Sequence, residues 1–180
     1  SGDQVRALCA DLRGAVGWQA PVFVDQEGGR VQGFRPPMAR EWEPPLDHVA
    51  LAGRHAVRVL ELRYQIIALE LRALGLDGNC VPTLDVARSQ THPFLRNRCL
   101  GDRAQDVTER GRAVAAGTLA GGVLPVFKHM PGHGRALTDS HLEVPSTDAP
   151  RSHLAEDFAP FRALSDLPLG MTGHVIYSAL

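Results

Sequence analysis

Short apolar runs alternate with longer stretches of helical periodicity along this chain. The runs expected to form strands are residues 21–25, 78–86, 123–127 and 169–175. Between them, apolar residues recur at steps of three and four positions, as in helices that bury one face. Strands that alternate with helices form parallel sheets with right-handed crossovers. The sequence therefore predicts an α/β fold built on a parallel sheet.

Helices are expected wherever this periodicity persists. The expected segments are residues 3–13, 47–74, 107–118 and 154–164. For the second segment, Asp47 is the expected N-cap and Gly75 the expected C-terminal stop. Gly121 and Gly122 are expected to close the third, and Pro160 to kink the fourth.

The length of the chain limits which architectures it can form. The chain has 180 residues, 44% of them hydrophobic, which suits one domain with a real core. A closed eightfold barrel typically needs about 250 residues, and only about four strand–helix units are visible. The chain also begins in a helix and ends on a strand. We therefore expect residues 1–180 to form a partial (β/α)₈ TIM-type barrel domain that lacks the first strand and the C-terminal part; the alternative is a small open α/β sheet.

The charge and the cysteine content limit which classes of partner and which cellular compartment the sequence favours. A net charge of -1 leaves no basic excess to neutralise phosphates, which argues against nucleic acid and anionic membranes as partners. No apolar run approaches the length of a membrane span, and no signal peptide is visible. The three cysteines are scattered and lack metal-ligand spacing, so they are expected to be reduced thiols of a cytoplasmic protein.

Ionisable residues stand at the C-terminal ends of the expected strands. They are Asp25, Asp85, Lys128 with His129, and His174. In a parallel barrel these strand ends share one face, where the loops build the active site. We therefore expect these side chains to converge on one functional site.

The segment after residue 127 holds the greatest concentration of ionisable groups. Residues 128–134 read Lys-His-Met-Pro-Gly-His-Gly, and Asp139-Ser140-His141 follows closely. A carboxylate near an imidazole fixes its tautomer and raises its basicity. Asp139 and His141 are therefore candidates for a general acid/base pair, whereas His133, between two glycines, is expected to have a structural role.

Two arginine-containing segments have more ordinary expected roles. Residues 27–30, Glu-Gly-Gly-Arg, indicate a tight turn that carries its own ion pair. Arg98 lies in an irregular segment after the second strand, where a single arginine would usually be a solvated surface group. The sequence has no Walker motif and no dinucleotide fingerprint, so nucleotide binding is disfavoured.

Taken together, these motifs resemble the family 3 glycoside hydrolases, specifically the bacterial cytoplasmic β-N-acetylhexosaminidases of peptidoglycan recycling. The matching segments are residues 24–32, 82–86, 97–101, 128–134, 139–141 and 174–177. The resemblance implies a (β/α)₈ barrel and the retaining hydrolysis of terminal β-linked N-acetylglucosamine from cell-wall muropeptides. It implies no cofactor, and a monomer at full length.

The resemblance also assigns substrate-binding residues. They are Asp25, Arg98, Lys128 and His129, which would hold the sugar hydroxyls and orient the N-acetyl group. The sequence departs from the family pattern at Gly33, where the family often has an arginine. A milder departure is Met130, where the family has phenylalanine.

By the same resemblance, His141 is the general acid/base and Asp139 its partner. The nucleophile would be an aspartate on a later strand, beyond Leu180. We therefore expect the full-length protein to be the hydrolase, and residues 1–180 alone to be inactive.

Two other hypotheses remain open. One is a non-catalytic N-acetylglucosamine-binding remnant. The other is a metal-dependent hydrolase, although the spacing of the potential zinc ligands matches no standard pattern. Those ligands would be His129, His133, His141, His174 and Asp25.

Overall fold

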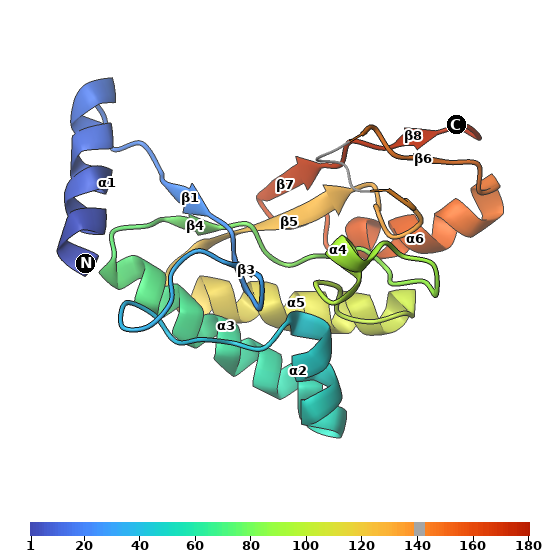
Figure 1. Ribbon diagram of the computed structural model, residues 1–180, viewed down its shortest axis with the longest axis horizontal. Helices are drawn as coiled ribbons and strands as arrows, with labels where there is room; N and C mark the ends of the chain where they lie inside the picture. The colour runs from blue at the N-terminus through green and yellow to red at the C-terminus, as the bar shows by residue number, and fades with distance from the viewer. Residues whose placement is uncertain (139–142) are drawn as a thin grey trace.

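A parallel sheet forms the centre of the computed structural model, which describes residues 1–138 and 143–180 (Figure 1). Its strand order is β1-β4-β5-β7, and all neighbouring strands are parallel. The strands are β1 (Phe23–Val24), β4 (Gly78–Asn79), β5 (Leu124–Met130) and β7 (Leu169–Thr172). The expected α/β fold with a parallel sheet is confirmed.

The helices are α1 (Gly2–Val16), α2 (Pro45–Ala52), α3 (Ala56–Ala73), α4 (Pro93–Arg96), α5 (Ala104–Ala120) and α6 (Arg151–Ala163). Two small ribbons accompany the sheet. In one, β2 (Gln26–Gly28) pairs antiparallel with β3 (Val31–Gln32); in the other, β6 (Ser146–Thr147) pairs parallel with β8 (Ile176–Tyr177). Figure 1 shows α3 and α5 side by side beneath the sheet, with the N-terminal helix and the C-terminal segment at opposite ends.

The helix expected over residues 47–74 is interrupted. α2 ends at Ala52, a 3₁₀ turn spans Gly53–His55, and α3 begins at Ala56. Gly53 has a φ of 52°, which lies outside the right-handed helical region and is tolerated by glycine. The apolar spacing continues through this break, which explains why the sequence pattern did not reveal it.

The structure confirms the expected C-terminal ends of two helices but not the expected N-cap of α2. Asp47 is not the N-cap of α2; Pro44 holds that position, and Asp47 lies in the first turn. A carboxylate there still interacts favourably with the helix dipole. Gly75 follows α3 with a φ of 87°, and Gly122 follows α5 with a φ of 79°, so both glycine stops are confirmed.

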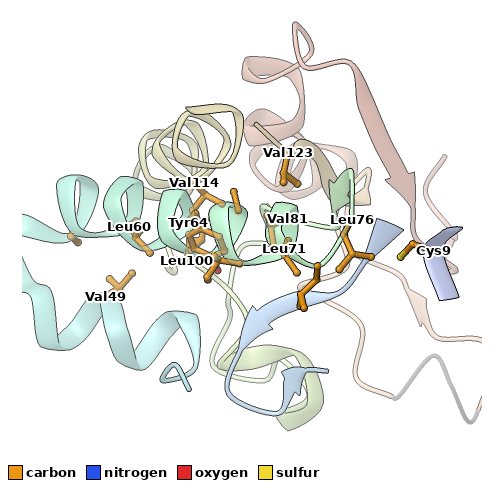
Figure 2. Close-up of a cluster of buried hydrophobic side chains, with 14 residues drawn as sticks. Cys9, Val49, Leu60, Tyr64, Leu71, Leu76, Val81, Leu100, Val114 and Val123 are labelled. Atoms are coloured by element: carbon orange, nitrogen blue, oxygen red, sulfur yellow. The ribbon is translucent and has the colours of Figure 1, made fainter. Parts of the chain in front are cut away.

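The main hydrophobic core lies between α3, α5 and the sheet (Figure 2). Leu60, Tyr64 and Leu71 recur on one face of α3 and are each at most 2% exposed. They pack in one cluster with Val114 of α5 and Val81 of the segment after β4. The three- and four-residue steps in the sequence therefore record a helix face that packs against a neighbouring helix and the sheet.

A second core supports the C-terminal end of β5. It contains Leu84, Val86, Val107, Phe127, Phe161 and Leu164. These residues join α5 and α6 to β5, so the strand that carries Lys128 and His129 is fixed from below. Across residues 1–138 and 143–180, none of the helices combines the length and apolar character needed to cross a bilayer.

Candidate functional site

A cavity of about 720 Å³ opens at the C-terminal ends of β1, β5 and β7. Its lining includes all the substrate-binding residues expected from the sequence: Asp25, Arg98, Lys128 and His129. His174, which follows β7, lines it too. The expected convergence is therefore present for these strand-end side chains, whereas Asp85 does not line the cavity and contacts His129 instead. Asp139 and His141 lie outside the described residues.

Buried charges are paired at the floor of this cavity. The Lys128 side chain is 1% exposed; its ammonium contacts Asp25, and its Nζ lies 2.5 Å from Oε1 of Glu27. Arg98 donates to Glu27 through Nε at 3.0 Å and Nη2 at 2.8 Å. Such burial is tolerated only when each charge has a well-placed partner, so Glu27 fixes two of the expected sugar-binding cations.

The prediction of an ion pair within the turn at residues 27–30 is wrong. Gly28 and Gly29 have φ values of 113° and 58°, so the tight turn itself is confirmed. Glu27, however, points inward to Arg98 and Lys128, whereas Arg30 lies over the Phe94 ring at 5.7 Å.

The sequence did not predict that Glu27 pairs with the cations of this site. Burial alone would raise the pKa of its carboxyl, but the charges and hydrogen bonds of Lys128 and Arg98 bring that pKa below its ordinary value of 4.5. The side chain is therefore ionised at neutral pH. A signal was present: the residue stands two positions after the strand-end Asp25, in the same matching segment.

Helix α3 supports the Glu27 turn from behind. Arg63 Nη2 and Tyr64 Oη donate to the Glu27 carbonyl oxygen at 2.7 and 3.0 Å. A Cβ at Gly28 would lie 2.0 Å from Arg63 Nη2, so glycine is required for this close approach. Burial raises the pKa of Tyr64 to about 12, which keeps its hydroxyl a donor.

His129 is held from below by a buried carboxylate. Asp85 is 0% exposed, and its Oδ2 lies 2.7 Å from Nδ1 of His129. Its Oδ1 accepts the backbone N–H of His133 at 2.7 Å. Asp85 was expected as a strand-end carboxylate without a predicted partner, and the structure shows two partners, His129 Nδ1 and the His133 N–H.

The arrangement around His133 agrees with its expected structural role. Its ring is buried edge-on between the Phe94 ring, at a centroid distance of 5.7 Å, and the His129 ring, at 5.8 Å. Burial lowers the pKa of His133, so the ring is neutral at pH 7. At the adjacent Gly134, a Cβ would lie 2.0 Å from the Val86 carbonyl oxygen. The segment after β5 therefore packs directly on the segment after β4.

A second buried carboxylate anchors this segment to α6. Asp157 is 2% exposed and pairs with Arg88 at 2.6 Å and with Arg135. Tyr177 adds a hydrogen bond from its hydroxyl to the Gly132 carbonyl oxygen at 2.6 Å. These contacts hold Gly132 and Arg135 against the C-terminal part of the chain.

The zinc hypothesis gains no support from the described part of the chain. Within it, no group of three or more His, Cys, Asp or Glu side chains is placed to hold a metal ion. His129 is paired with Asp85, and His141 lies outside the described residues.

Comparisons with known proteins agree with this geometry. The family model described as the glycosyl hydrolase family 3 N terminal domain matches residues 5–180. The β-hexosaminidase of Methylococcus capsulatus is 36% identical over 183 residues, which cover 100% of this chain and 54% of the relative. That of Alkalilimnicola ehrlichii is 37% identical over 186 residues, with coverages of 100% and 53%. This chain thus spans about half the length of these curated relatives.

Comparison with solved structures leads to the same family. Native NagZ from Neisseria gonorrhoeae superposes with a TM-score of 0.88 at 29% identity, covering 99% of this chain and 54% of NagZ. NagZ from the same organism in complex with N-trifluoroacetyl-D-glucosamine superposes with a TM-score of 0.89, also at 29% identity and with the same coverages. The described sheet is therefore part of a (β/α)₈ TIM-type barrel. Sequence and structure together show that the chain belongs to glycosyl hydrolase family 3.

Proposed function

We propose that this chain supplies the sugar-binding half of a retaining β-N-acetylhexosaminidase that removes terminal β-linked N-acetylglucosamine from peptidoglycan-derived muropeptides. The observation that carries the proposal is the convergence of Asp25, Arg98, Lys128 and His129 on one cavity at the strand ends. Relatives named β-hexosaminidase and a NagZ structure holding an N-acylated glucosamine support the choice of sugar.

The charges around the cavity suit a neutral, hydroxyl-rich ligand. Among the described residues at or beneath its floor, carboxylates and cations balance: Asp25, Glu27 and Asp85 against Arg30, Arg98 and Lys128. A sugar needs several donors and acceptors and brings no charge of its own. Asp25, whose side chain is 52% exposed, offers a carboxylate to the open cavity, where it can accept sugar hydroxyls.

The chemical step follows from the family resemblance. In it, His141 protonates the departing oxygen and later activates water, while Asp139 orients the imidazole. An aspartate beyond Leu180 attacks the anomeric carbon and forms the covalent glycosyl intermediate of a retaining enzyme. No cofactor takes part.

We also propose a cytoplasmic location and a monomer at full length. All three cysteines are free and buried, which fits a reducing compartment. Muropeptides, with their N-acetylglucosamine–anhydromuramyl core, would be the substrate class met there.

Binding and turnover can be tested separately. The 180-residue chain and a form extended beyond Leu180 through the rest of a family 3 barrel are each assayed for N-acetylglucosamine binding and for hydrolysis of a chromogenic N-acetyl-β-glucosaminide. We expect both forms to bind and the extended form alone to hydrolyse. His141→Ala in the extended form should abolish turnover and leave binding intact.

Each other outcome has a definite meaning. Hydrolysis by residues 1–180 alone would overturn the position of the nucleophile. Binding without turnover in the extended form would favour the sugar-binding remnant. Absence of binding in both folded forms would overturn the proposal.

A further inference from the structure

We propose that Asp85 is a positioning residue that holds His129 as the Nδ1–H tautomer, so that Nε2 faces the cavity as a hydrogen-bond acceptor. The tautomer assignment rests on the described contacts alone. Only the group that Nε2 receives, a sugar hydroxyl, rests on the proposed function.

The first step concerns the proton between Asp85 and His129. Both carboxylate oxygens of Asp85 are occupied: Oδ2 lies 2.7 Å from Nδ1, and Oδ1 accepts the His133 backbone N–H at 2.7 Å. Burial alone would raise the pKa of Asp85, but the hydrogen bonds that its two oxygens receive from His129 and from the His133 N–H lower it. An ionised carboxylate only accepts hydrogen bonds. The proton therefore belongs to Nδ1.

The second step concerns the other ring nitrogen. Nε2 of His129 lies 3.4 Å from Nη2 of Arg98. A guanidinium presents donors only and stays charged, so a proton on Nε2 would face another N–H group. Arg98 is itself fixed by its two hydrogen bonds to Glu27. Nε2 is therefore placed to accept from Arg98 rather than to donate.

The third step concerns what this arrangement offers a ligand. The His129 side chain is 16% exposed and lines the cavity beside Asp25 and Lys128. The Lys128 ammonium is a donor, whereas the fixed Nε2 is an acceptor, whose 3.4 Å contact with Arg98 is long for a hydrogen bond and leaves its lone pair available to share with a hydroxyl. A hydroxyl both donates and accepts, so it can bridge the two kinds of group. Asp85 touches no ligand and acts only through the imidazole.

Nitrogen NMR of the unliganded protein tests the assignment directly. Long-range ¹H–¹⁵N correlation spectra distinguish a protonated ring nitrogen from a bare one. We expect Nδ1 of His129 to be protonated and Nε2 to be bare at neutral pH. The opposite tautomer, or protonation of both nitrogens, would overturn the proposal whether or not the protein binds sugar.

Asp85→Asn then tests the consequence. Asparagine keeps a carbonyl oxygen for the His133 N–H but presents an N–H to Nδ1, which moves the ring proton to Nε2. We expect the NMR pattern to invert and N-acetylglucosamine binding to weaken about three- to tenfold, the range of one lost hydrogen bond. Asp166→Asn is the matched control, because Asp166 is an exposed carboxylate paired with Arg112 at 2.6 Å; binding should not change.

A double-mutant cycle separates positioning from a general structural effect. In a His129→Ala background, Asp85→Asn should leave the remaining sugar affinity unchanged. A further loss there would show that Asp85 acts through the His133 segment and would overturn the proposal. If the wild-type protein does not bind N-acetylglucosamine, the proposed function fails, while the tautomer measurement still decides the role of Asp85.

Discussion

Glu27 lies between two buried cations, the Lys128 ammonium and the Arg98 guanidinium. Removing its charge would leave both cations without their shared partner in a desolvated site. We expect Glu27→Gln to lower the free energy of unfolding by about 3–5 kcal/mol, the usual cost of breaking a buried pair from one side. Urea denaturation at pH 7 measures this difference.

Glu41→Gln is the matched control for that experiment. Glu41 pairs with Arg35, but their side chains are 64% and 42% exposed. Exposed pairs contribute at most about 1 kcal/mol, so this variant should be close to the wild type. Equal losses in the two variants would contradict the special role of the buried pair.

The same carboxylate predicts a pH dependence. The pKa of Glu27 lies below 4.5 in the folded state, so its contribution to stability is present above pH 4.5 and is lost as the pH falls through the folded pKa. Asp85 behaves in the same way below its ordinary value of 3.8. We expect the unfolding free energy of the wild type to fall with acidification in this range.

Urea denaturation at a series of acidic pH values measures that slope. The Glu27→Gln variant should show a shallower fall than the wild type, because one linked proton has been removed. Parallel curves for the two proteins would show that Glu27 does not contribute to acid sensitivity.

For single residues, the sequence predicted which side chains lie at the site better than it predicted which side chains pair with them. The strand-end rule located Asp25, Lys128 and His129, and the resemblance added Arg98. The partners of these residues were not predictable, because Glu27 and Arg98 are 71 positions apart and Asp25 and Lys128 are 103 apart. Such pairings depend on strand order and on the direction of a turn, which local patterns do not encode.

Among the elements, the contact between α3 and α5 depends on small residues. A Cβ at Gly117 of α5 would lie 2.1 Å from the Glu61 carbonyl oxygen of α3. Backbone cannot move aside as a side chain can, so the helices would have to separate. We expect Gly117→Ala to destabilise the protein by about 1–3 kcal/mol, the usual cost of overpacking, as measured by thermal or urea unfolding.

Gly14→Ala is the control for helix propensity. Gly14 lies within α1, and a Cβ there would meet nothing within 4 Å. Alanine should stabilise this position by about 0.5–1 kcal/mol. Stabilisation by Gly117→Ala as well would show that α3 and α5 are not in close contact at this point.

Elements were predictable where periodicity and glycine stops agreed, as at the ends of α3 and α5. The break at Gly53 was not, because the apolar spacing runs on through it. The strand expected over residues 78–86 is a two-residue strand, β4 (Gly78–Asn79), followed by extended chain that pairs again only at Thr83 with Lys128. Apolar character marked the buried segment, but hydrogen bonding decided how much of it is strand.

At the scale of the whole molecule, the outer strands of the sheet are expected to promote association between copies of this chain. β1 pairs only with β4, and β7 only with β5, within the described residues. Unpaired edges recruit strands from other chains, and both carry exposed apolar side chains: Phe23 is 38% exposed and Leu169 is 36% exposed. We therefore expect the 180-residue chain to self-associate in sedimentation velocity experiments as its concentration rises.

A charge on one edge should weaken this association. We expect Leu169→Lys, on β7, to shift the sedimentation distribution toward smaller species. Ala155→Lys adds the same charge on an exposed position of α6 and should have little effect. An equal shift in both variants would point to net charge rather than to the strand edge.

The sequence alone determined the α/β class, the parallel sheet and the strand ends that carry the site. These depend on local periodicity and on the shared direction of parallel strands, both of which are present in the order of residues. Only the tertiary structure decided that Glu27 pairs with Arg98 and Lys128, and that Asp85 lies beneath His129. Those contacts form between segments far apart in the chain, where burial removes water and leaves each charge dependent on whichever partner the fold brings within reach.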